Sequence, residues 1–287
     1  MTLQNFLTVS DHNRDVSGMK YVYPVVSRRA GGVSIGINLN INNACNWRCL
    51  YCQVPNLTRG TPPPIALDVL EAELRAFLTY ALHGDFMLRY VAEGDRHLQD
   101  VAFSGNGEPT SAKEFPEVLT MLERVLHDFN LLGKDQLHPI KVRLISNGSL
   151  MDKPAVLASL KQLAKLNGEV WFKLDAGTEA GIARINDVHI KPASHLQRLR
   201  NCAALCPTFI QTCVFGMDGE PPSEDDILAY LARLAEVKEV VLGVLLYGLA
   251  RPSYQVEAPR LSRLPHEWMV AMGVRISALG LKVQISD

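Results

Sequence analysis

Three cysteines with short, regular spacing occur at Cys45, Cys49 and Cys52, in a CxxxCxxC pattern. They follow an apolar run, Val33 to Ile41, and precede the proline-rich residues 61–64, so we expect them on a loop after a strand. Iron–sulfur clusters normally take four cysteine ligands. A loop with three cysteines therefore predicts a cluster that leaves one iron open to a ligand that is not protein.

Two simpler interpretations of this loop are a zinc site and a set of small buried side chains. Zinc sites usually have four protein ligands, and histidine commonly accompanies cysteine in them. The nearest histidines, His12 and His83, lie more than thirty positions from Cys52. This separation favours the cluster over zinc, although the spacing by itself leaves the three interpretations open.

A second stretch that could bind a ligand is SGNGEPT, residues Ser104 to Thr110. Gly105 and Gly107 would let a ligand approach the backbone closely, and Glu108 supplies a carboxylate. A tight turn that carries a solvated glutamate explains the same residues equally well. The cysteine loop favours the ligand-binding interpretation of this motif, because both stretches follow predicted strands.

Two later strands also end in polar residues. One leads into residues 146–148, Ser-Asn-Gly, which a strand-to-helix turn would also explain. In the other, Lys173 and Asp175 flank Leu174 and so point to the same side of the strand, where a buried ion pair is the alternative to a functional role.

Strands and helices must alternate to position these motifs, and the hydrophobic pattern predicts that they do. The expected strands are 33–40, 98–103, 140–145, 169–174, 208–215, 240–247 and 281–285, and the expected helices are 66–83, 114–131, 153–166, 193–205, 224–237 and 265–279. This order indicates parallel strands joined by right-handed helical crossovers. Ligands bind at the carboxyl ends of strands in barrel-like folds, where nearly all of the polar motifs lie.

The predicted fold class is therefore α/β, with six strand–helix units and a terminal strand, a partial (βα)6 barrel similar to a TIM barrel. Residues 1–32 are polar and mixed, and we interpret them as an N-terminal lead-in segment. Residues 33–287 contain no repeat, low-complexity tract or obvious linker, so we expect a single domain there.

Composition sets limits on the function. Of the 287 residues, 47% are hydrophobic and 21% are charged, and the net charge of -1 lacks the basic excess typical of nucleic-acid binding. The apolar run Val240 to Leu249 is too short to cross a membrane, and the N-terminal residues show no signal-peptide pattern. Six cysteines without an export signal favour a reducing compartment, so we expect a cytoplasmic protein with no membrane partner.

The combination of CNWRCLYC, FSGNGEPT, ISNGSL, KLDAGTEA and LYGLARP resembles the radical S-adenosylmethionine superfamily, and within it the wyosine-synthase-like branch. The resemblance spans about residues 33–261 and implies the partial barrel of that superfamily. It also implies two cofactors, a [4Fe-4S] cluster and S-adenosyl-L-methionine. In this family an electron from the cluster cleaves the sulfonium reductively, and the resulting 5'-deoxyadenosyl radical abstracts hydrogen from a substrate.

The resemblance assigns roles to individual residues. It places the cluster on Cys45, Cys49 and Cys52, and it implies Lys173 and Asp175 as catalytic residues, with Asp175 also meeting the cofactor. The other residues that it implies for binding S-adenosylmethionine are Tyr51, Gly105, Asn106, Gly107, Glu108, Ser146, Asn147 and Gln211. Tyr247 and Arg251 follow a strand and are candidates to face the substrate.

The favoured function is a radical enzyme that acts on a small molecule or a peptide, with an electron donor such as flavodoxin or ferredoxin. One alternative is a tRNA-modifying enzyme of the wyosine type, whose RNA would need a basic rim such as Arg28, Arg29, Lys191 and Arg198. Wyosine synthases carry further cysteines upstream for a second cluster, but this chain has none before Cys45. The other alternative is a non-enzymatic iron–sulfur domain with a redox-sensing or structural role.

Three further cysteines need a separate interpretation. Cys202 and Cys206 are four positions apart on a predicted helix, and Cys213 lies on the next predicted strand. They could hold a second cluster, but free cysteine is among the most buried residue types. We therefore expect core thiols.

Overall fold

An eight-stranded curved sheet forms the centre of the computed structural model, which describes residues 7, 18–26, 31–132 and 139–286. The strand order is β1-β2-β5-β6-β7-β8-β10-β12, and all neighbours from β2 onward pair in parallel. β1 pairs antiparallel with β2 at one edge. The strands of this sheet are β1 (Val22–Val26), β2 (Val33–Ile37), β5 (Leu98–Phe103), β6 (Lys141–Ser146), β7 (Gly168–Lys173), β8 (Thr208–Cys213), β10 (Val244–Tyr247) and β12 (Val283–Ser286).

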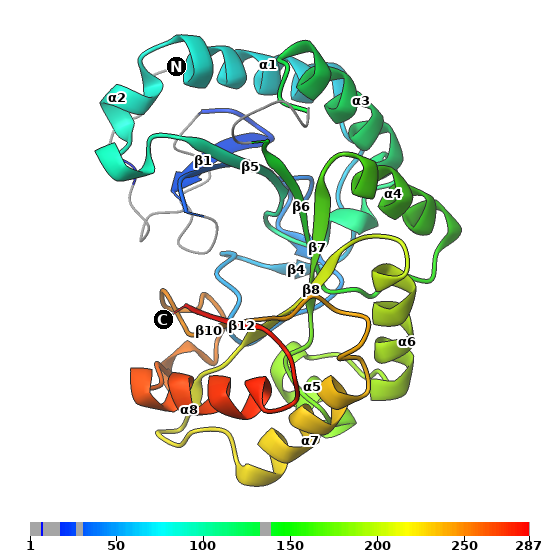
Figure 1. Cartoon of the computed structure of the whole chain (residues 1–287), viewed down its shortest axis with the longest axis vertical. Helices are drawn as coiled ribbons and strands as arrows, with labels where there is room; N and C mark the ends of the chain where they lie inside the picture. Colours follow the sequence, from blue (N-terminus) through cyan, green and yellow to red (C-terminus); the bar gives the residue numbers. More distant parts are fainter. Residues whose placement is uncertain (1–6, 8–17, 27–30, 133–138, 287) are drawn as a thin grey trace.

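The helices lie along the outer, convex side of the sheet, and the sheet curves into an arc that is open on one side (Figure 1). They are α1 (Leu67–His83), α2 (Phe86–Tyr90), α3 (Phe115–Asp128), α4 (Pro154–Lys165), α5 (Glu179–Asn186), α6 (Pro192–Ala203), α7 (Glu224–Ala235) and α8 (His266–Ser277). Each longer helix buries one apolar face: α1, for example, buries Leu70, Leu74, Phe77, Leu78 and Ala81. The main hydrophobic core is therefore the layer between helices and sheet.

Local sequence explains where several helices begin. Proline occupies the first turn of α3, α4 and α6, where its missing N–H costs no helical hydrogen bond. α7 begins after Ser223, whose side chain accepts a hydrogen bond from the Asp226 backbone N–H. Three acidic residues follow in its first turn, near the positive end of the helix dipole. Ser223 is thus the N-cap of α7.

Two short paired segments complete the sheet structure. β3 (Ala44–Cys45) pairs in parallel with β4 (Thr58–Arg59) and closes the base of the cysteine loop. β9 (Gly216–Met217) pairs antiparallel with β11 (Leu261–Ser262). In Figure 1 the light-blue chain that includes β4 runs inside the arc of the sheet. The cysteine loop is thus on the concave side, away from the helices.

The predicted alternation of seven parallel strands with helices agrees with the structure, apart from the short strands β3, β4, β9 and β11, which were not predicted, and three further differences. Residues 22–26, which we placed in the lead-in segment, form strand β1. α5 was not predicted, because its eight residues are too few to show a helical period. The predicted strand 240–247 begins only at Val244, because residues 238–242 turn out of α7 before the sheet resumes.

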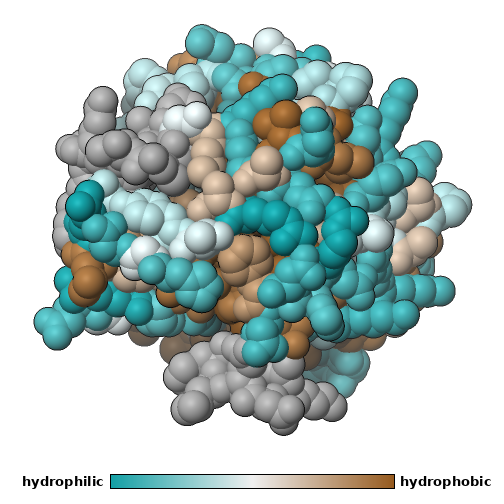
Figure 2. Space-filling model, turned by 90° about the horizontal axis from the view of Figure 1, so that it is seen from above, coloured by the Kyte–Doolittle hydropathy of each residue, from teal (hydrophilic) through white to brown (hydrophobic). Residues whose placement is uncertain are grey.

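The face seen in Figure 2 is mostly hydrophilic, with smaller hydrophobic groups between the polar side chains. Among the residues that the structure describes, none of the helices has both the length and the apolar character needed to span a bilayer.

Candidate functional site

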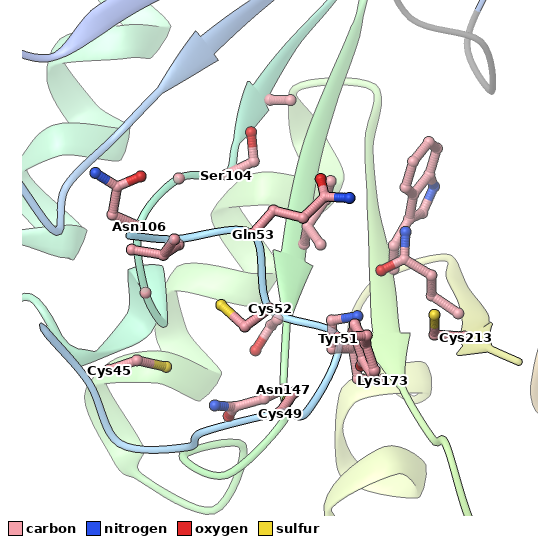
Figure 3. A pocket seen from close by; sticks show the side chains of 18 of the residues that line it. Cys45, Cys49, Tyr51, Cys52, Gln53, Ser104, Asn106, Asn147, Lys173 and Cys213 are labelled. Atoms are coloured by element: carbon pink, nitrogen blue, oxygen red, sulfur yellow. The ribbon is translucent and has the colours of Figure 1, made fainter. Parts of the chain in front are cut away.

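A cavity of about 290 Å³ lies on the concave side of the sheet, and its lining extends from the carboxyl ends of the parallel strands to Ser34, Asp100 and Arg143 nearer their amino ends. The three cysteines of the CxxxCxxC motif line it together with residues from the ends of β5, β6, β7, β8 and β10. In Figure 3 Cys45 and Cys52 lie on the same side of the cysteine loop, and Tyr51 of that loop lies beside Lys173. The tertiary structure therefore brings together motifs that are more than one hundred and fifty positions apart in sequence.

All three thiols of the motif are free and half-buried. Burial raises the pKa of Cys45 to about 11 and that of Cys49 to about 12, so both are protonated thiols at neutral pH. The Trp47 backbone N–H donates to Cys45 Sγ at 3.5 Å, and Asn186 Nδ2 donates to Cys49 Sγ at 3.3 Å. Hydrogen bonds to sulfur are one of the factors that set the reduction potential of an iron–sulfur cluster.

The arrangement of these thiols does not converge on one point. Within the described ranges, no group of three or more His, Cys, Asp or Glu side chains surrounds a single metal-ion position. A cluster of several irons has different requirements, because each thiolate binds its own iron. Three free thiols along one cavity wall, with N–H donors beside two of them, are a donor set that suits a cluster better than a single zinc ion.

Two neighbouring segments hold the cysteine loop in place. On one side, the backbone N–H groups of Arg48 and Leu50 donate to the carbonyls of Asn186 and Ile185 at the end of α5. On the other side, the Ser253 hydroxyl donates to the carbonyls of Leu50 and Cys52, at 2.6 and 3.0 Å. The loop is thus fixed by tertiary hydrogen bonds on both flanks.

The glycines of the SGNGEPT motif pack against the cysteine loop and its approach. A Cβ atom on Gly107 would lie 2.2 Å from the Ala44 carbonyl oxygen, and one on Gly105 would lie 2.3 Å from Asn38 Oδ1. These contacts require glycine whether or not a ligand is present. Both residues also line the cavity, so their predicted role in binding S-adenosylmethionine stays a prediction.

Glu108 is buried, with 2% of its surface exposed, so the interpretation as a solvated glutamate is wrong. Its carboxylate accepts hydrogen bonds from the Thr110 N–H and hydroxyl, the Ser146 hydroxyl at 2.8 Å and the Asn147 N–H at 2.6 Å. Burial raises its pKa above the ordinary value for a glutamate, although these donors favour the ionised form. Glu108 therefore ties the second-strand motif to the third-strand motif.

The two asparagines of these motifs reach across to the cysteine loop. Asn106 Nδ2 donates to Asn43 Oδ1 at 2.6 Å, and Asn147 Nδ2 donates to Asn46 Oδ1 at 2.8 Å. Asn106 Oδ1 is buried and has no hydrogen-bond partner within the described part of the chain. A buried acceptor without a partner, on a residue that lines the cavity, is available to a bound ligand.

Lys173 and Asp175 are linked through Tyr51. Lys173 Nζ donates to the Tyr51 hydroxyl at 3.0 Å and to the Tyr247 hydroxyl at 2.7 Å, and Tyr51 donates to Asp175 Oδ2 at 2.5 Å. Burial alone would lower the pKa of Lys173, but Tyr247, Asp175 and Cys49 raise it above the ordinary value. Lys173 is therefore a half-buried cation on the cavity wall.

Asp175 does not line the cavity that contains the cysteines. Its carboxylate also accepts hydrogen bonds from Asn186 Nδ2 at 2.8 Å and from the Cys213 N–H at 2.9 Å. It lines a second cavity, of about 310 Å³, between the end of β8 and the helices α5, α7 and α8. Lys173 and Tyr51, in contrast, line the cavity that contains the cysteines.

Gln211 points into the cysteine cavity from β8, beside its register partner Lys173 on β7. The side chain is 1% exposed, and its Nε2 donor has no partner among the described residues. A buried N–H without an acceptor is costly, so this donor indicates a ligand or water in the cavity. The predicted binding role of Gln211 therefore has a structural basis, although nothing yet tests it.

The basic rim considered for RNA is not assembled around this cavity in the described residues. Arg28 and Arg29 fall outside the described residues. Arg198 forms an ion pair with Asp152, and neither it nor Lys191 lines the cavity. Arg251 does line the mouth of the cavity.

The other three cysteines do not lie together in the structure. Cys202 and Cys206 lie in the main core, where their thiols contact Thr208 Oγ1 and the Gly168 carbonyl. Cys213 belongs to a separate small cluster with Tyr51 and lines the cysteine cavity.

Sequence reasoning missed several residues that support the site. Asn186 contacts both Cys49 and Asp175, and Ser253, Gln255 and Glu257 hold the cysteine loop from behind. None of these residues belongs to a short motif. Their roles depend on tertiary contacts between segments up to 209 positions apart.

The fold and the site define an α/β partial barrel with a cysteine loop at the carboxyl ends of its strands. Residues 39–234, more than half of the chain, match the family model described as "Radical SAM superfamily". The chain belongs to the Radical SAM superfamily. Membership implies an enzyme that uses an iron–sulfur cluster and S-adenosylmethionine.

Solved structures share the fold. A radical SAM methyltransferase from Sphaerobacter thermophilus has a TM-score of 0.58 at 13% identity, with coverage of 88% of this chain and 66% of that one. The anSMEcpe structure with bound AdoMet and Cp18Cys peptide has a TM-score of 0.57 at 17% identity, with coverage of 88% and 62%. These similarities confirm the predicted partial barrel.

The names of the curated relatives say little about function. A "UPF0026 protein" of Helicobacter pylori strain 26695 is 24% identical over 83% of this chain and 68% of its own length. Another, from strain J99, is 28% identical over 58% of this chain, and the match covers 46% of that protein. A "GTPase Obg" of Brachyspira hyodysenteriae is 26% identical over 140 residues, and the match covers only 17% of that protein.

Proposed function

We propose that this chain is a radical S-adenosylmethionine enzyme in which Cys45, Cys49 and Cys52 hold a [4Fe-4S] cluster. One observation carries the proposal: three free thiols line the same cavity as two residues, Asn106 and Gln211, each with a buried polar atom that has no hydrogen-bond partner among the described residues. When bound, the cluster and S-adenosylmethionine would supply a 5'-deoxyadenosyl radical for hydrogen abstraction. The protein would orient the reactants and exclude side reactions.

Different residues of the cavity would bind the reactants, position neighbouring groups and supply charge. Asn106 offers an acceptor and Gln211 a donor to the bound molecules. Glu108 positions the Asn147 turn, because its carboxylate already accepts four hydrogen bonds from protein groups. Lys173, held by two tyrosine hydroxyls, places a positive charge on the cavity wall, where it would attract an anionic group.

We infer that the substrate is a small molecule or a peptide, and that a flavodoxin or ferredoxin in the reducing cytoplasm donates the electron. All six cysteines are free, as such a compartment requires. The motifs support placement in the wyosine-synthase-like branch. A tRNA substrate has less support, because the rim residues considered for it do not surround the cavity within the described ranges.

The test is anaerobic reconstitution with iron and sulfide, followed by reduction and chromatography for 5'-deoxyadenosine after S-adenosylmethionine is added. We expect cleavage by the parent protein and a loss of at least about one hundredfold in Cys49→Ser, because one cluster ligand is gone. Iron content and the paramagnetic resonance signal of the reduced cluster give readouts that do not depend on activity.

The matched control is Cys206→Ala, which removes a thiol from the main core. This variant should keep the iron content and the cleavage of the parent. Equal loss of iron in both variants would show that the effect is general unfolding or that Cys206 also binds iron. A fully loaded parent that neither binds nor cleaves S-adenosylmethionine would support the non-enzymatic alternative.

A further inference from the structure

The second cavity, of about 310 Å³, adjoins the cavity that contains the cysteines but is distinct from it. Among the described residues only Cys213 lines both. Of the residues expected to bind the cluster or S-adenosylmethionine, Asp175 alone lines the second cavity. The proposed function therefore gives this space no occupant.

The walls of the second cavity are mainly apolar and include three aromatic rings. Phe215 follows β8, Tyr230 belongs to α7 and Trp268 belongs to α8. Met217 and Met272 add flexible thioether side chains to the same lining. Aromatic and flexible apolar side chains around one space are typical of sites that bind small organic molecules.

The hydroxyl groups of this cavity leave an acceptor open. The Thr212 hydroxyl donates its single hydrogen to the Leu174 carbonyl at 2.9 Å, so the Tyr230 hydroxyl, 2.7 Å away, must donate to Thr212. The Tyr230 oxygen therefore keeps lone pairs that accept no hydrogen bond within the described ranges, although this residue is only 5% exposed. Such a buried acceptor is available to a ligand that carries a donor.

The charged groups that line the second cavity are mainly acidic. They are the guanidinium of Arg184 and the carboxylates of Asp175, Asp218, Glu220 and Asp226. Arg184 pairs with Asp226 at 2.8 Å. Asp218 pairs at 2.6 Å with Arg260, which does not line the cavity. Glu220 forms no ion pair with any residue that the structure describes. The remaining negative charge attracts a cation and repels an anion.

Asp175 connects this cavity to the cysteine loop. Its carboxylate accepts hydrogen bonds from Tyr51 and Asn186, and Asn186 also donates to Cys49 Sγ at 3.3 Å. Lys173 contacts the same Tyr51 hydroxyl and balances part of the charge of Asp175. A cationic ligand beside Asp175 would compete with Tyr51 and Asn186 for the carboxylate, and it would thereby change the surroundings of Cys49.

We propose that the second cavity is an effector site for an aromatic small molecule that carries an ammonium group. The apolar walls and the three rings receive the aromatic part, and aromatic faces also attract an organic ammonium. The acceptors for the N–H groups are the Tyr230 oxygen and the carboxylates of Asp175 and Glu220. The inference rests on the proposed function only for the target of the effector, which is the cluster beside Cys49.

The experiment measures the binding of three probes that share a phenyl group and differ in charge. Phenethylamine is cationic, phenethyl alcohol is neutral and hydrocinnamate is anionic. Their dissociation constants are measured by saturation-transfer NMR on the reconstituted protein. The variant is Trp268→Leu, and the matched control is Val274→Leu on the same helix, whose side chain is 64% exposed and does not line the cavity.

We expect phenethylamine to bind at least about tenfold more tightly than phenethyl alcohol, and hydrocinnamate to bind most weakly, because the cavity is acidic. Trp268→Leu should weaken the binding of phenethylamine by about tenfold through loss of an aromatic face. Val274→Leu should match the parent, and both variants should keep the iron content of the parent. Equal affinity for the three probes, no binding of phenethylamine at millimolar concentration, or an equal effect of the two substitutions would each overturn the proposal.

A second readout tests the effector role. The paramagnetic resonance signal of the reduced cluster should change when phenethylamine saturates the parent, because Asn186 contacts both Asp175 and Cys49. In Trp268→Leu the same change should require about tenfold more phenethylamine. An unchanged signal in the saturated parent would overturn the effector role.

The same measurements separate this inference from the proposed function. If the three probes bind in the expected order but S-adenosylmethionine is not cleaved, the proposed function is wrong and the binding site stands. If S-adenosylmethionine is cleaved but the cationic probe is not preferred, the assignment of the second cavity alone is wrong.

Discussion

Two carboxylates of the site, Glu108 and Asp175, serve first as acceptors for groups of the protein itself. Each accepts hydrogen bonds from at least one backbone N–H and one side chain of a different segment. Buried carboxylates are costly unless such donors surround them. At the scale of single residues, the site is therefore held by polar side chains that join neighbouring strand ends, and the cysteines depend on this framework for their position.

Gly107 gives a direct test of that framework. Gly107→Ala would place a methyl group against the Ala44 carbonyl and the Asn40 side chain, and it would displace the start of the cysteine loop. We expect the free energy of unfolding to fall by about 2 kcal/mol, as is usual for overpacking. Urea denaturation measures this change, and iron bound after reconstitution should fall with it.

The control for this substitution is Gly94→Ala, because a Cβ atom at Gly94 meets no atom within 4 Å. That variant should keep both the stability and the iron content of the parent within error. If Gly107→Ala behaves in the same way, the cysteine loop does not depend on the close approach at Gly107.

His195 predicts a pH dependence. Burial, with a smaller contribution from Arg198, lowers its pKa from 6.5 to about 4, while the Lys173 carbonyl and Asp175 act in the opposite direction. Between pH 6.5 and 4 the unfolded chain binds more protons than the folded chain, so this group makes stability fall as the pH falls. The loss attributable to His195 between pH 7 and pH 5 is about 2 kcal/mol.

The measurement is urea denaturation of the parent and of His195→Phe at both pH values. Phenylalanine keeps a ring beside Trp47 and Phe172 but cannot be protonated. The variant should lose about 2 kcal/mol less stability than the parent on acidification. Identical losses would show that His195 is not the titrating group. Comparison of the two proteins also removes the effect of Glu108, whose raised pKa works in the opposite direction.

At the scale of elements, the cysteine loop has too little regular structure to keep its conformation without contacts from other elements. Among the described residues its only strand pairing is the two-residue contact of β3 with β4, and hydrogen bonds from Asn106, Asn147, α5 and residues 252–257 supply further support. All of these supporting residues come from later parts of the chain. Correct placement of the thiols therefore requires the barrel to be folded as far as residue 257.

Ser253→Ala tests how much residues 252–257 support the cysteine loop. The hydroxyl donates to the carbonyls of Leu50 and Cys52 and accepts from the Gln255 N–H, so its removal leaves buried polar groups without partners. We expect a loss of about 1–3 kcal/mol in stability and faster release of iron to a chelator. Ser194→Ala, at an exposed position in the first turn of α6, should change neither property.

At the scale of the whole molecule, the curved sheet separates three environments. Helices cover its convex side and build the hydrophobic core, while the concave side holds the cavity with the three thiols. Residues 252–257 form the third, a segment that is hydrogen-bonded to the cysteine loop and exposes Tyr254 and Val256 to solvent.

The sequence predicted much of this architecture because the signals were local. Strand Leu98–Phe103 was predicted with its exact bounds, and most helix ends fell within three residues of their observed positions. The antiparallel strand β1 was missed, since residues 22–26 form a strand only by pairing with β2. The short helix α5 was missed because eight residues give little periodicity, yet it carries Asn186, which contacts Cys49.

The sequence alone determined the alternation of strands and helices and the spacing of the three cysteines. Both features depend on residues that are close together in the sequence. It also determined the family, through motifs that each lie after a strand. Only the tertiary structure decided that Gly107 packs against the cysteine loop, that Glu108 is buried among donors, and that Tyr51 connects Lys173 to Asp175. These features arise from contacts between distant segments, and burial and hydrogen bonding of that kind exist only once the barrel has closed around them.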